Sequence, residues 1–364
     1  MNYFSGSYLE EDVMFLLKKI EIKELDIVEK EALIQSGKKH YSEMISPEYQ
    51  PTKEYIDIFY NALSLNEEKF IRDVFYLAKK ISLKKDFVIV SLARAGTPIG
   101  VLLKRILKKY FNLDINHYSV SIIRDRGIDK NAIKYIVENN KNSELVFIDG
   151  WTGKGVISQE LENSIKEFNI ENKTNISSNL YVVTDISGKA YFSSSFDDYL
   201  IPSSVLNSTV SGLVSRTIFN TDYCNKNDFH ACKYYDNLKE IDFSLFFIDT
   251  ILNSIEKNYK ILEKIELNEI DNSIKKELSI KTDKFISELM NEYKITNKNY
   301  IKPGIGETTR VLLRRSPELI FLKNLSSSEN KHLLFLSKNR SITIIENQNM
   351  PYNSLGIISR VSKE

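Results

Sequence analysis

Cysteine, histidine and tryptophan are scarce in this chain of 364 residues, which contains two, four and one of them, respectively. The two cysteines, Cys224 and Cys232, are too few for a framework of disulfide bonds. Such a composition excludes a small disulfide-stabilised secreted domain and is typical of proteins in a reducing compartment. We therefore expect a cytoplasmic protein.

Long apolar runs and an excess of charge are also absent from the sequence. No apolar run approaches the length of about 18 residues that indicates a membrane span. The first residues lack the basic region, apolar stretch and cleavage site of a secretory signal, so we expect no membrane partner. The 50 basic and 49 acidic residues give a net charge of +1, so any basic surface for nucleic acid has to be local. The oligomeric state stays open, with a homo-oligomer as one option.

Four apolar runs of strand length alternate with stretches of helical periodicity in the first half of the chain. The runs cover 86–92, 117–124, 144–149 and 179–187. Near-continuous apolar strands separated by helices predict an α/β fold with a mostly parallel sheet that has helices on both faces. Upstream, apolar residues at helical spacing predict a short amphipathic helix over 10–22.

Length and pattern divide the chain into three segments. At roughly 100–200 residues per domain, the length fits two or three domains. We assign 1–250 to the parallel-sheet domain. The highly charged helical pattern of 251–298 predicts a helical spacer, and the short helices and strands of 299–364 predict a compact α/β module of its own.

The only tryptophan, Trp151, lies in the loop "DGWTGKG", directly after the apolar run 144–149. Its glycines let a ligand approach the main chain closely, and the helix that follows directs free N–H groups at the loop. Thr152 adds a hydroxyl and Lys154 a positive charge, which together suit a phosphate. Asp149 would repel a phosphate but can accept hydrogen bonds from sugar hydroxyls. The loop predicts a ribose-phosphate site, with a plain tight turn as the alternative.

Two further segments offer groups for a second anion. "ARAGTPIG" follows the apolar run 86–92 and supplies Arg94 and the backbone amides around Gly96. "RDRG" places Arg124 and Arg126 on either side of an aspartate and could fold over a bound polyphosphate, with an exposed charged turn as the alternative. Because ligands of such sheets bind beyond the carboxyl ends of the strands, we expect one crevice with phosphate groups at both ends of the ligand.

The order of these segments resembles the type I phosphoribosyltransferases, which use phosphoribosyl pyrophosphate and magnesium. A closer resemblance joins "FSGSYLEEDVMFLLKKI", "IQSGKKHYSEMISPE", "SLARAGTPIG", "IDGWTGKGVISQEL" and "NSTVSGLVSRT" to the StiP-type phosphoribosyltransferase-like proteins. These proteins are associated with bacterial tellurite-resistance and stress gene clusters. The resemblance covers about residues 4–250.

The resemblance implies a role for each matching position. Asp149 would hold the ribose hydroxyls, and Arg124 and Arg126 would approach the pyrophosphate, so these three are the implied catalytic residues. Magnesium would be carried by the pyrophosphate, with no metal site of the protein's own. The residues implied to bind phosphoribosyl pyrophosphate are Arg94, Ala95, Gly96, Asp149, Gly150, Trp151, Thr152, Gly153, Lys154 and Gly155.

The acidic loop departs from the common pattern. Common phosphoribosyltransferases have two adjacent acids and a longer loop before the Thr-Gly pair, whereas this chain has only Asp149 and "GW". The second acid helps to hold the ribose or an attacking base. Two functions therefore stay open: phosphoribosyl transfer to a base or nucleoside-type acceptor, and a sensor of phosphoribosyl pyrophosphate or a nucleotide without turnover.

Thiol chemistry is a further alternative, since StiP proteins often carry the label cysteine protease. A thiol protease needs a cysteine and a histidine within hydrogen-bond reach, and Cys224, His230 and Cys232 lie close together in sequence. The family pattern, however, has its cysteine near "IPSSVLNSTVSG", where this chain has no thiol. We expect no protease. We also expect no metal site, because these residues lack a fourth ligand and a finger-like spacing.

The segment "KPGIGETTRVLLRRS" is a glycine-rich turn that enters a helix with several arginines. It resembles the Pelota-type RNA-binding domain, related to the ribosomal kink-turn-binding proteins, over about residues 299–360. Helix N-terminal amides and arginines can hold phosphates, and Glu307 can accept from guanine amino groups, so structured RNA is an expected partner. A small docking domain with an exposed basic helix is the alternative. The residues implied to bind RNA are Gly304, Gly306, Glu307, Thr308, Arg310 and Arg314.

Overall fold

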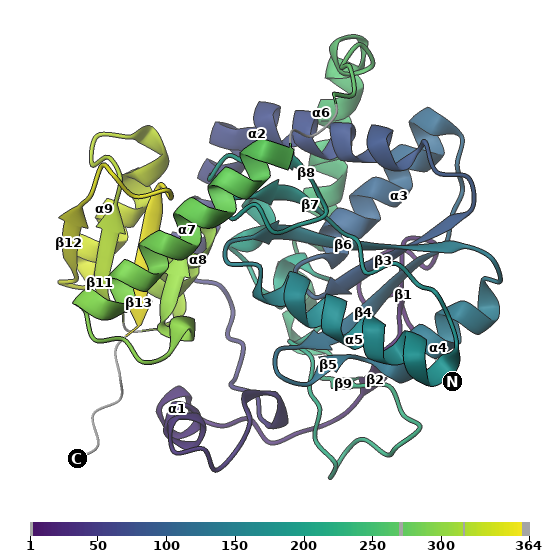
Figure 1. The fold of residues 1–364 in the computed structure, drawn as a ribbon, viewed down its shortest axis with the longest axis horizontal. Helices are drawn as coiled ribbons and strands as arrows, with labels where there is room; N and C mark the ends of the chain where they lie inside the picture. Colours follow the sequence, from purple (N-terminus) through teal and green to yellow (C-terminus); the bar gives the residue numbers. More distant parts are fainter. Residues whose placement is uncertain (1–2, 269–271, 316, 359–364) are drawn as a thin grey trace.

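The computed structural model describes residues 3–268, 272–315 and 317–358. A large domain and a smaller C-terminal domain lie side by side (Figure 1). The large domain is built on a sheet in which all neighbours along the main path are parallel, with one short antiparallel strand, β5 (Gly127–Ile128), on β4. From edge to edge the strands are β1 (Met14–Phe15), β4 (His117–Ile123), β3 (Phe87–Ala93), β6 (Glu144–Thr152), β7 (Leu180–Asp185) and β8 (Phe192–Ser195).

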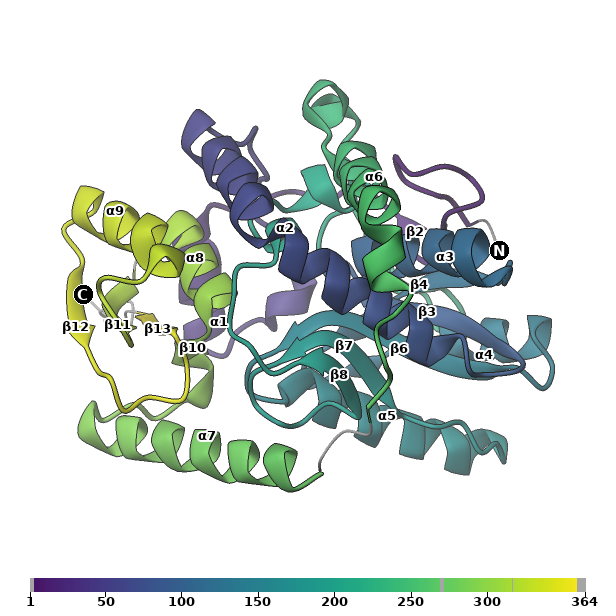
Figure 2. The same cartoon turned by 90° about the horizontal axis from the view of Figure 1, so that it is seen from above.

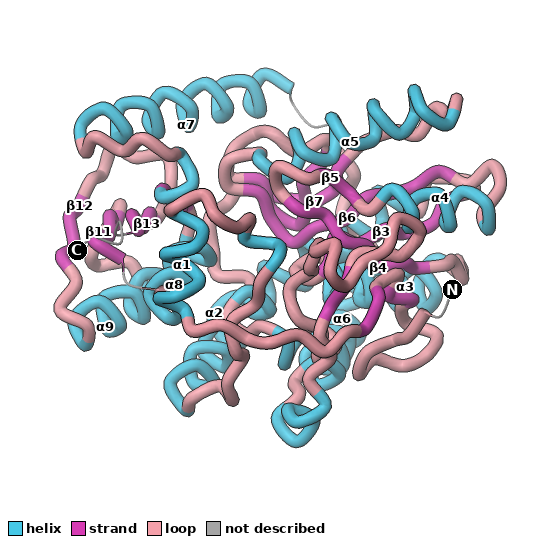
Figure 3. Tube along the Cα trace, turned by 90° about the horizontal axis from the view of Figure 1, so that it is seen from below, coloured by secondary structure: helices cyan, strands magenta, loops and turns pink. Residues whose placement is uncertain are grey.

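Helices cover both faces of this sheet, as Figure 3 shows most clearly. One face packs against α2 (Lys53–Ile81), α3 (Thr97–Phe111) and α6 (Ser244–Leu262), and the other packs against α4 (Lys130–Asn139) and α5 (Val156–Asn172). Adjacent residues of a strand point to opposite faces of the sheet, and helices cover both faces of this one. The apolar runs are therefore nearly continuous, and the prediction of a mostly parallel sheet with helices on both faces is confirmed.

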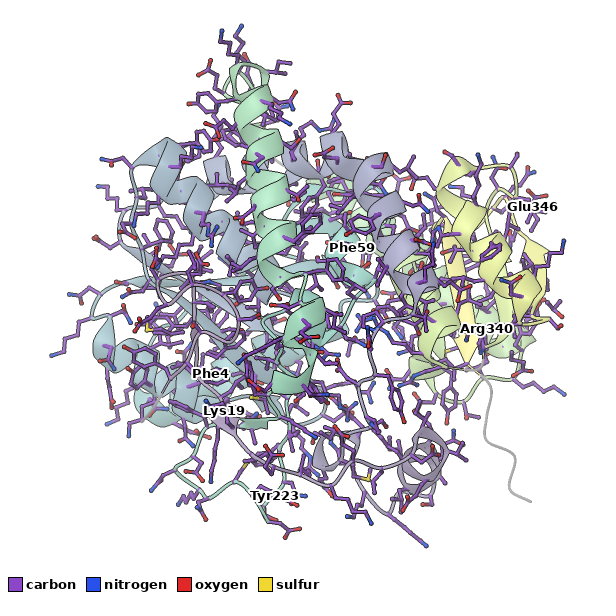
Figure 4. All side chains as sticks on the ribbon, turned by 180° about the vertical axis from the view of Figure 1, so that it is seen from behind. Phe4, Lys19, Phe59, Tyr223, Arg340 and Glu346 are labelled. Carbon is purple, nitrogen blue, oxygen red and sulfur yellow. The ribbon has the colours of Figure 1, made fainter. Side chains whose placement is uncertain are left out.

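Alternate residues of the central strands divide between two apolar cores. Ile89 and Ile148 belong to the core under α2, α3 and α6, whereas Val90 and Phe147 belong to the core under α4 and α5. Aromatic side chains join the helices of the first core. Phe59 of α2 lies between α2 and α6, with its ring centroid 6.4 Å from that of Phe247 (Figure 4).

The expected helix over 10–22 is wrong. This segment instead forms two short strands, β1 at the sheet edge and β2 (Lys18–Lys19), which pairs with β9 (Ala231–Cys232). The apolar residues of the segment are buried by partners that lie 100 or more residues away in sequence, so tertiary pairing overrides the local helical spacing.

The chain changes direction between β3 and β6. From β3 it proceeds to β4 on one side, then returns across β3 to place β6 and β7 on the other side. Such a switch point opens a crevice at the carboxyl ends of the two strands. The "ARAG" loop follows β3 and the "DGWTGKG" loop ends β6, so both flank the crevice.

The C-terminal domain has its own four-stranded sheet, in the order β10 (Ile301–Pro303), β13 (Ser354–Ile358), β11 (Pro317–Leu322) and β12 (Thr343–Glu346). Helices α8 (Ile305–Arg314) and α9 (Lys331–Asn339) supply apolar residues to one side, and α7 (Asn272–Glu292) supplies Ile286 and Leu289 to the other. Figure 2 shows α7 running along this domain. The predicted spacer therefore contains helices that pack on two different sheets.

The two domains share an apolar core. Ile305 and Leu312 of α8 belong to the same cluster of buried residues as Ile201 and Val205 of the large domain. The C-terminal domain is thus docked through buried apolar surface as well as polar contacts. Among the described residues, no helix combines the length and apolar character needed to cross a bilayer.

Candidate functional site

The two loops at the switch point touch each other. A Cβ atom added to Gly150 would lie 3.8 Å from the carbonyl oxygen of Ala95. A Cβ atom on Gly96 would lie 2.5 Å from the carbonyl oxygen of Ile148, so this position needs glycine because two backbones approach closely. The structure brings together the two segments that the sequence assigned to one crevice.

The turn of the "DGWTGKG" loop is held by the hydroxyl group of Thr152. Thr152 ends β6, and its Oγ1 accepts a hydrogen bond of 3.1 Å from the amide of Gly155. Gly155 has φ of 71° and caps α5, which begins at Val156. The free N–H groups of the first helical turn therefore point toward the loop, as an anion site requires.

Lys154 is directed at the C-terminal domain. Its Nζ donates to the carbonyl oxygens of Lys298 at 2.9 Å and Ile301 at 2.7 Å. Burial, together with the nearby charge of Lys302, lowers the pKa of Lys154 to about 7. The residue expected to meet a phosphate thus joins the two domains in this structure.

Asp149 is partly buried, and one of its carboxylate oxygens accepts a backbone hydrogen bond. Its Oδ1 accepts a hydrogen bond of 2.7 Å from the amide of Gly150. Burial raises the pKa of Asp149 to about 7, the charge of Arg310 opposes the shift, and that of Glu307 adds to it. Both of these neighbouring charges come from α8, so the C-terminal domain sets part of the electrostatic environment of the crevice.

Arg94 is tied to a segment that the sequence analysis did not single out. Its guanidinium forms an ion pair with Glu48 and donates to Oδ1 of Asn207 at 2.7 Å. Glu48 also accepts from the amide of Ser208 at 3.0 Å. The charge of Arg94 keeps the pKa of Glu48 below its ordinary value although burial opposes this. Glu48 lies in the family-like stretch "SEMISPE", which was the one available signal for it.

Arg124 and Arg126 lie on the turn between β4 and β5. The Arg124 guanidinium is 4.9 Å from the ring centroid of Tyr41, and Arg126 forms an ion pair with Glu43. Both side chains are partly exposed. The amide of Arg124 also donates to the hydroxyl of Tyr41 at 2.8 Å, which ties this turn to the segment that contains Glu43.

The turn expected to bind RNA faces the crevice. A Cβ atom on Gly306 would lie 3.9 Å from Cε2 of Trp151, and the Arg310 guanidinium lies 5.7 Å from the centroid of the Trp151 ring. The basic helix of this domain is therefore not freely exposed, because its first turn packs on Trp151. A small pocket at the junction has walls from both domains: Trp151, Thr184, Ile186, Asp198, Tyr199, Ile201, Ser204, Pro303, Gly304, Gly306 and Glu307.

Asp198 occupies the N-terminus of α8. Its Oδ1 accepts from the amide of Ile305 at 2.8 Å and its Oδ2 from the amide of Asn353 at 2.8 Å. Burial raises the pKa of Asp198 to about 6. This carboxylate takes the helix position where an RNA phosphate was expected. No local sequence pattern indicates this role, because the partners of Asp198 lie more than 100 residues away.

Two other residues implied to bind RNA are held inside the protein, Arg314 half-buried and Thr308 fully buried. Arg314 donates to the carbonyl oxygen of Val205 at 2.6 Å, and burial lowers its pKa to about 9. Thr308 is fully buried, and its hydroxyl accepts a hydrogen bond of 3.0 Å from Ser354 inside the C-terminal domain. Arg310 and Glu307 keep partial exposure at the crevice.

Both cysteines are buried. Burial raises the pKa of Cys232 to about 12 and also raises that of Cys224. His230 bonds through Nδ1 to Oγ of Ser121 at 2.8 Å. Among the described residues, which include every cysteine and histidine of the chain, no hydrogen bond joins a thiol to an imidazole, and no cluster of three metal-binding side chains is formed.

A larger groove of about 670 Å³ lies away from these loops. Lys19 places its Nζ 4.9 Å from the ring centroid of Phe4 there (Figure 4). Its lining contains none of the predicted site residues: Tyr3, Phe4, Leu17, Lys18, Lys19, Asp228 and Phe229.

Fold and site together define an α/β protein with a crevice at the switch point of a mostly parallel sheet and a small domain docked on it. Comparison with known proteins then shows that the chain belongs to the StiP family. The family described as "Tellurite-like stress resistance cysteine protease StiP" matches residues 6–252, and the "PELOTA RNA binding domain" matches residues 280–360. Both resemblances expected from the sequence are confirmed.

A curated relative covers nearly the whole chain. The protein named "Cysteine protease StiP" from Acinetobacter baylyi (strain ATCC 33305 / BD413 / ADP1) is 38% identical over 381 residues, which span 99% of this chain and 95% of the relative. The shared length includes both domains, so the docked C-terminal module is not an addition peculiar to this chain.

Solved structures show only remote likenesses. A purine phosphoribosyltransferase from Pyrococcus horikoshii Ot3 has 18% identity and a TM-score of 0.25, covering 35% of this chain and 80% of that one. A hypoxanthine-guanine-xanthine phosphoribosyltransferase has 14% identity and a TM-score of 0.24, covering 48% and 93%. A hypothetical protein from Neisseria gonorrhoeae with bound ppGpp has 14% identity and a TM-score of 0.22, covering 32% and 68%. Likenesses of this size say nothing about function.

Replacing Lys154 with methionine tests the tie between the domains. The carbonyl oxygens of Lys298 and Ile301 lose their donor, so we expect destabilisation by about 1–3 kcal/mol and a red shift of the Trp151 emission. Urea unfolding followed by tryptophan fluorescence measures both effects, since Trp151 is the only tryptophan. Lys166→Met, at an exposed position of α5, is the matched control. Unchanged emission and stability would contradict the tie.

Proposed function

We propose that this protein binds phosphoribosyl pyrophosphate in the crevice between β3 and β6 and transfers its phosphoribosyl group to a base or nucleoside-type acceptor. The close approach of Gly96 to the carbonyl oxygen of Ile148 carries this proposal, because it joins the loop after β3 to the end of β6 at the switch point. A ligand with a phosphate at each end and a sugar between them matches the loops and the carboxylate of Asp149.

Each part of the ligand has a matching group in the crevice. The 5-phosphate meets the amides of Gly153 to Val156 at the N-terminus of α5, where the helix dipole favours an anion. The free Oδ2 of Asp149 accepts from the ribose hydroxyls. The pyrophosphate meets the amides of Ala95 and Gly96, and Arg124 approaches it from the β4–β5 turn. Arg94, paired with Glu48, fixes the shape of that loop.

The reaction breaks the bond between the ribose anomeric carbon and the pyrophosphate oxygen and forms one to the acceptor nitrogen. The bond electrons leave with pyrophosphate, so the protein positions the reactants and stabilises the charge that develops on the leaving group. Magnesium, when bound with the pyrophosphate, neutralises part of this charge. We infer that the pyrophosphate oxygens carry this ion, because hard cations prefer oxygen ligands and Asp149 is used by the ribose.

Two alternatives have specific support. The single acid of the loop and the existing ion pair of Arg94 favour a sensor that binds the ligand without turnover. The family description favours a cysteine protease. Against the protease, both thiols of this chain are buried, have raised pKa values and form no hydrogen bond with a histidine among the described residues. A nucleophilic cysteine needs an accessible thiolate with a lowered pKa.

RNA binding is proposed for the C-terminal domain on the basis of the Pelota match. In the docked arrangement, Asp198 fills the helix N-terminus, and the half-buried Arg314 donates to the carbonyl oxygen of Val205. Arg310 is therefore the arginine of the motif that structured RNA reaches, at the mouth of the crevice. We place the protein in the cytoplasm, consistent with its free cysteines.

Asp149→Asn tests the ribose contact. The variant keeps the size of the side chain but removes its charge, so we expect the affinity for phosphoribosyl pyrophosphate with magnesium to fall by about tenfold or more. Isothermal calorimetry measures this, with Asp114→Asn on the exposed surface as the control. Unchanged affinity refutes the role of Asp149, and no binding by the native protein refutes the ligand. Binding without pyrophosphate release across a panel of bases supports the sensor.

The double variant Cys224→Ser with Cys232→Ser tests the protease. We expect it to bind phosphoribosyl pyrophosphate as the native protein does, because neither thiol lies among the residues of the crevice. The native thiols should react with iodoacetamide only after unfolding, as their burial predicts. A peptidase activity that is present in the native protein and lost in this variant would establish the alternative.

Arg310→Glu tests the RNA proposal. Reversing the charge should weaken the retention of structured RNA by about tenfold or more and reduce its salt dependence. Filter binding at several salt concentrations measures this. Arg340→Glu is the control, because Arg340 is an exposed arginine of the same domain (Figure 4). Equal losses in both variants would show that only the general charge of the domain matters.

A further inference from the structure

The loop at the end of β6 contains few hydrogen-bond acceptors for the hydroxyl groups of a sugar. A ribose presents two neighbouring hydroxyls as donors. One oxygen of Asp149 already accepts from the amide of Gly150, and among the residues that the structure describes no hydrogen bond is formed by the other oxygen, Oδ2. A second acceptor therefore has to come from another part of the fold if the sugar is to be held at both hydroxyls.

Helix α8 of the docked C-terminal domain brings the carboxylate of Glu307 to the end of β6. Asp149 and Trp151 are two residues apart on β6, so their side chains lie on the same face of the sheet. Glu307 lines the junction pocket together with Trp151. One residue before it, Gly306 approaches Cε2 of Trp151, with 3.9 Å to an added Cβ atom, and Arg310 lies over the same ring.

The position of Glu307 is fixed by contacts on both sides. The amide of Ile305, in the first turn of α8, donates to Asp198 at 2.8 Å, and Gly304 can approach Ile186 only because it lacks a Cβ atom. Arg310, one turn further along α8, donates to Oε1 of Glu307 at 3.1 Å. These contacts hold the side chain at the crevice before any ligand arrives.

Glu307 is ionised, and only one of its two carboxylate oxygens accepts a hydrogen bond among the described residues. Burial opposes its ionisation, but the charges of Arg310, Lys302 and Lys154 outweigh burial and keep its pKa below the ordinary value. Within the described part of the chain, Oε1 accepts from Arg310 and no hydrogen bond to Oε2 is formed. The exposed fraction of the Glu307 side chain is 28%, so a ligand in the crevice can reach it.

We propose that Glu307 is the second acid of the ribose-phosphate site, accepting from a ribose hydroxyl beside Asp149, so that the C-terminal domain completes the site. This inference rests on the proposed function, because its ligand is the phosphoribosyl group. The acid that the β6 loop lacks is supplied from 158 residues further along the chain, by the turn whose sequence resembles an RNA-binding motif.

The test uses the full chain and calorimetry with magnesium and phosphoribosyl pyrophosphate. Glu307→Gln, which is isosteric, should weaken binding about tenfold or more, while Trp151 emission and the thermal midpoint stay as in the native protein. Glu307→Asp, which keeps the charge on a shorter side chain, should lose less. Glu318→Gln, at an exposed position of β11, is the matched control. In the double variant with Asp149→Asn, the two losses should combine to less than their product, because both acids hold one sugar.

The outcomes separate the inference from the function on which it rests. Native affinity in Glu307→Gln, with a loss in Asp149→Asn, overturns the inference and leaves the proposed function standing. No binding by the native protein overturns both. Loss of structured RNA retention in Glu307→Gln with native affinity for phosphoribosyl pyrophosphate also overturns the inference and assigns Glu307 to RNA.

Discussion

The docking of the first turn of α8 against the end of β6 is the contact on which the rest of the site depends. Asp198 holds this turn through the amide of Ile305, and Lys154 holds the neighbouring segment through the carbonyl oxygens of Lys298 and Ile301. A shared apolar core lies behind these bonds. Since polar groups at a buried junction cost free energy unless they are paired, the bonds fix one orientation of the domain while the apolar contacts provide most of the attraction.

This docking decides the electrostatics of the crevice. The loop of β6 alone carries one acid and one lysine. With the C-terminal domain in place, Glu307, Arg310 and Lys302 add their charges to this space. Burial is the largest cause of the two pKa shifts: it raises the pKa of Asp149 to about 7 and lowers that of Lys154 to about 7. A charged ligand would then meet fixed groups of both signs in a site with little water, where electrostatic contacts are stronger than on an open surface.

The sequence predicted the sheet because strands covered on both faces have to be apolar throughout. The run 144–149 indicated β6 but missed its last three residues, because they resemble a loop. Two of them, Trp151 and Thr152, nevertheless pair with β7. The positions of the two glycine-containing loops were also predictable, because their glycines follow apolar runs of strand length. The partners of Lys154, Arg94 and Arg314 were not, because each lies more than 40 residues away and no local pattern specifies it.

A crystal structure of the full chain with magnesium and phosphoribosyl pyrophosphate tests the central claim most directly, namely that both domains build one ribose-phosphate site. The account predicts the 5-phosphate at the amides of Gly153 to Val156 and the ribose between Asp149 and Glu307, with α8 still docked on Trp151. A ligand bound elsewhere, or a ligand in the crevice with the C-terminal domain displaced from it, would contradict the account.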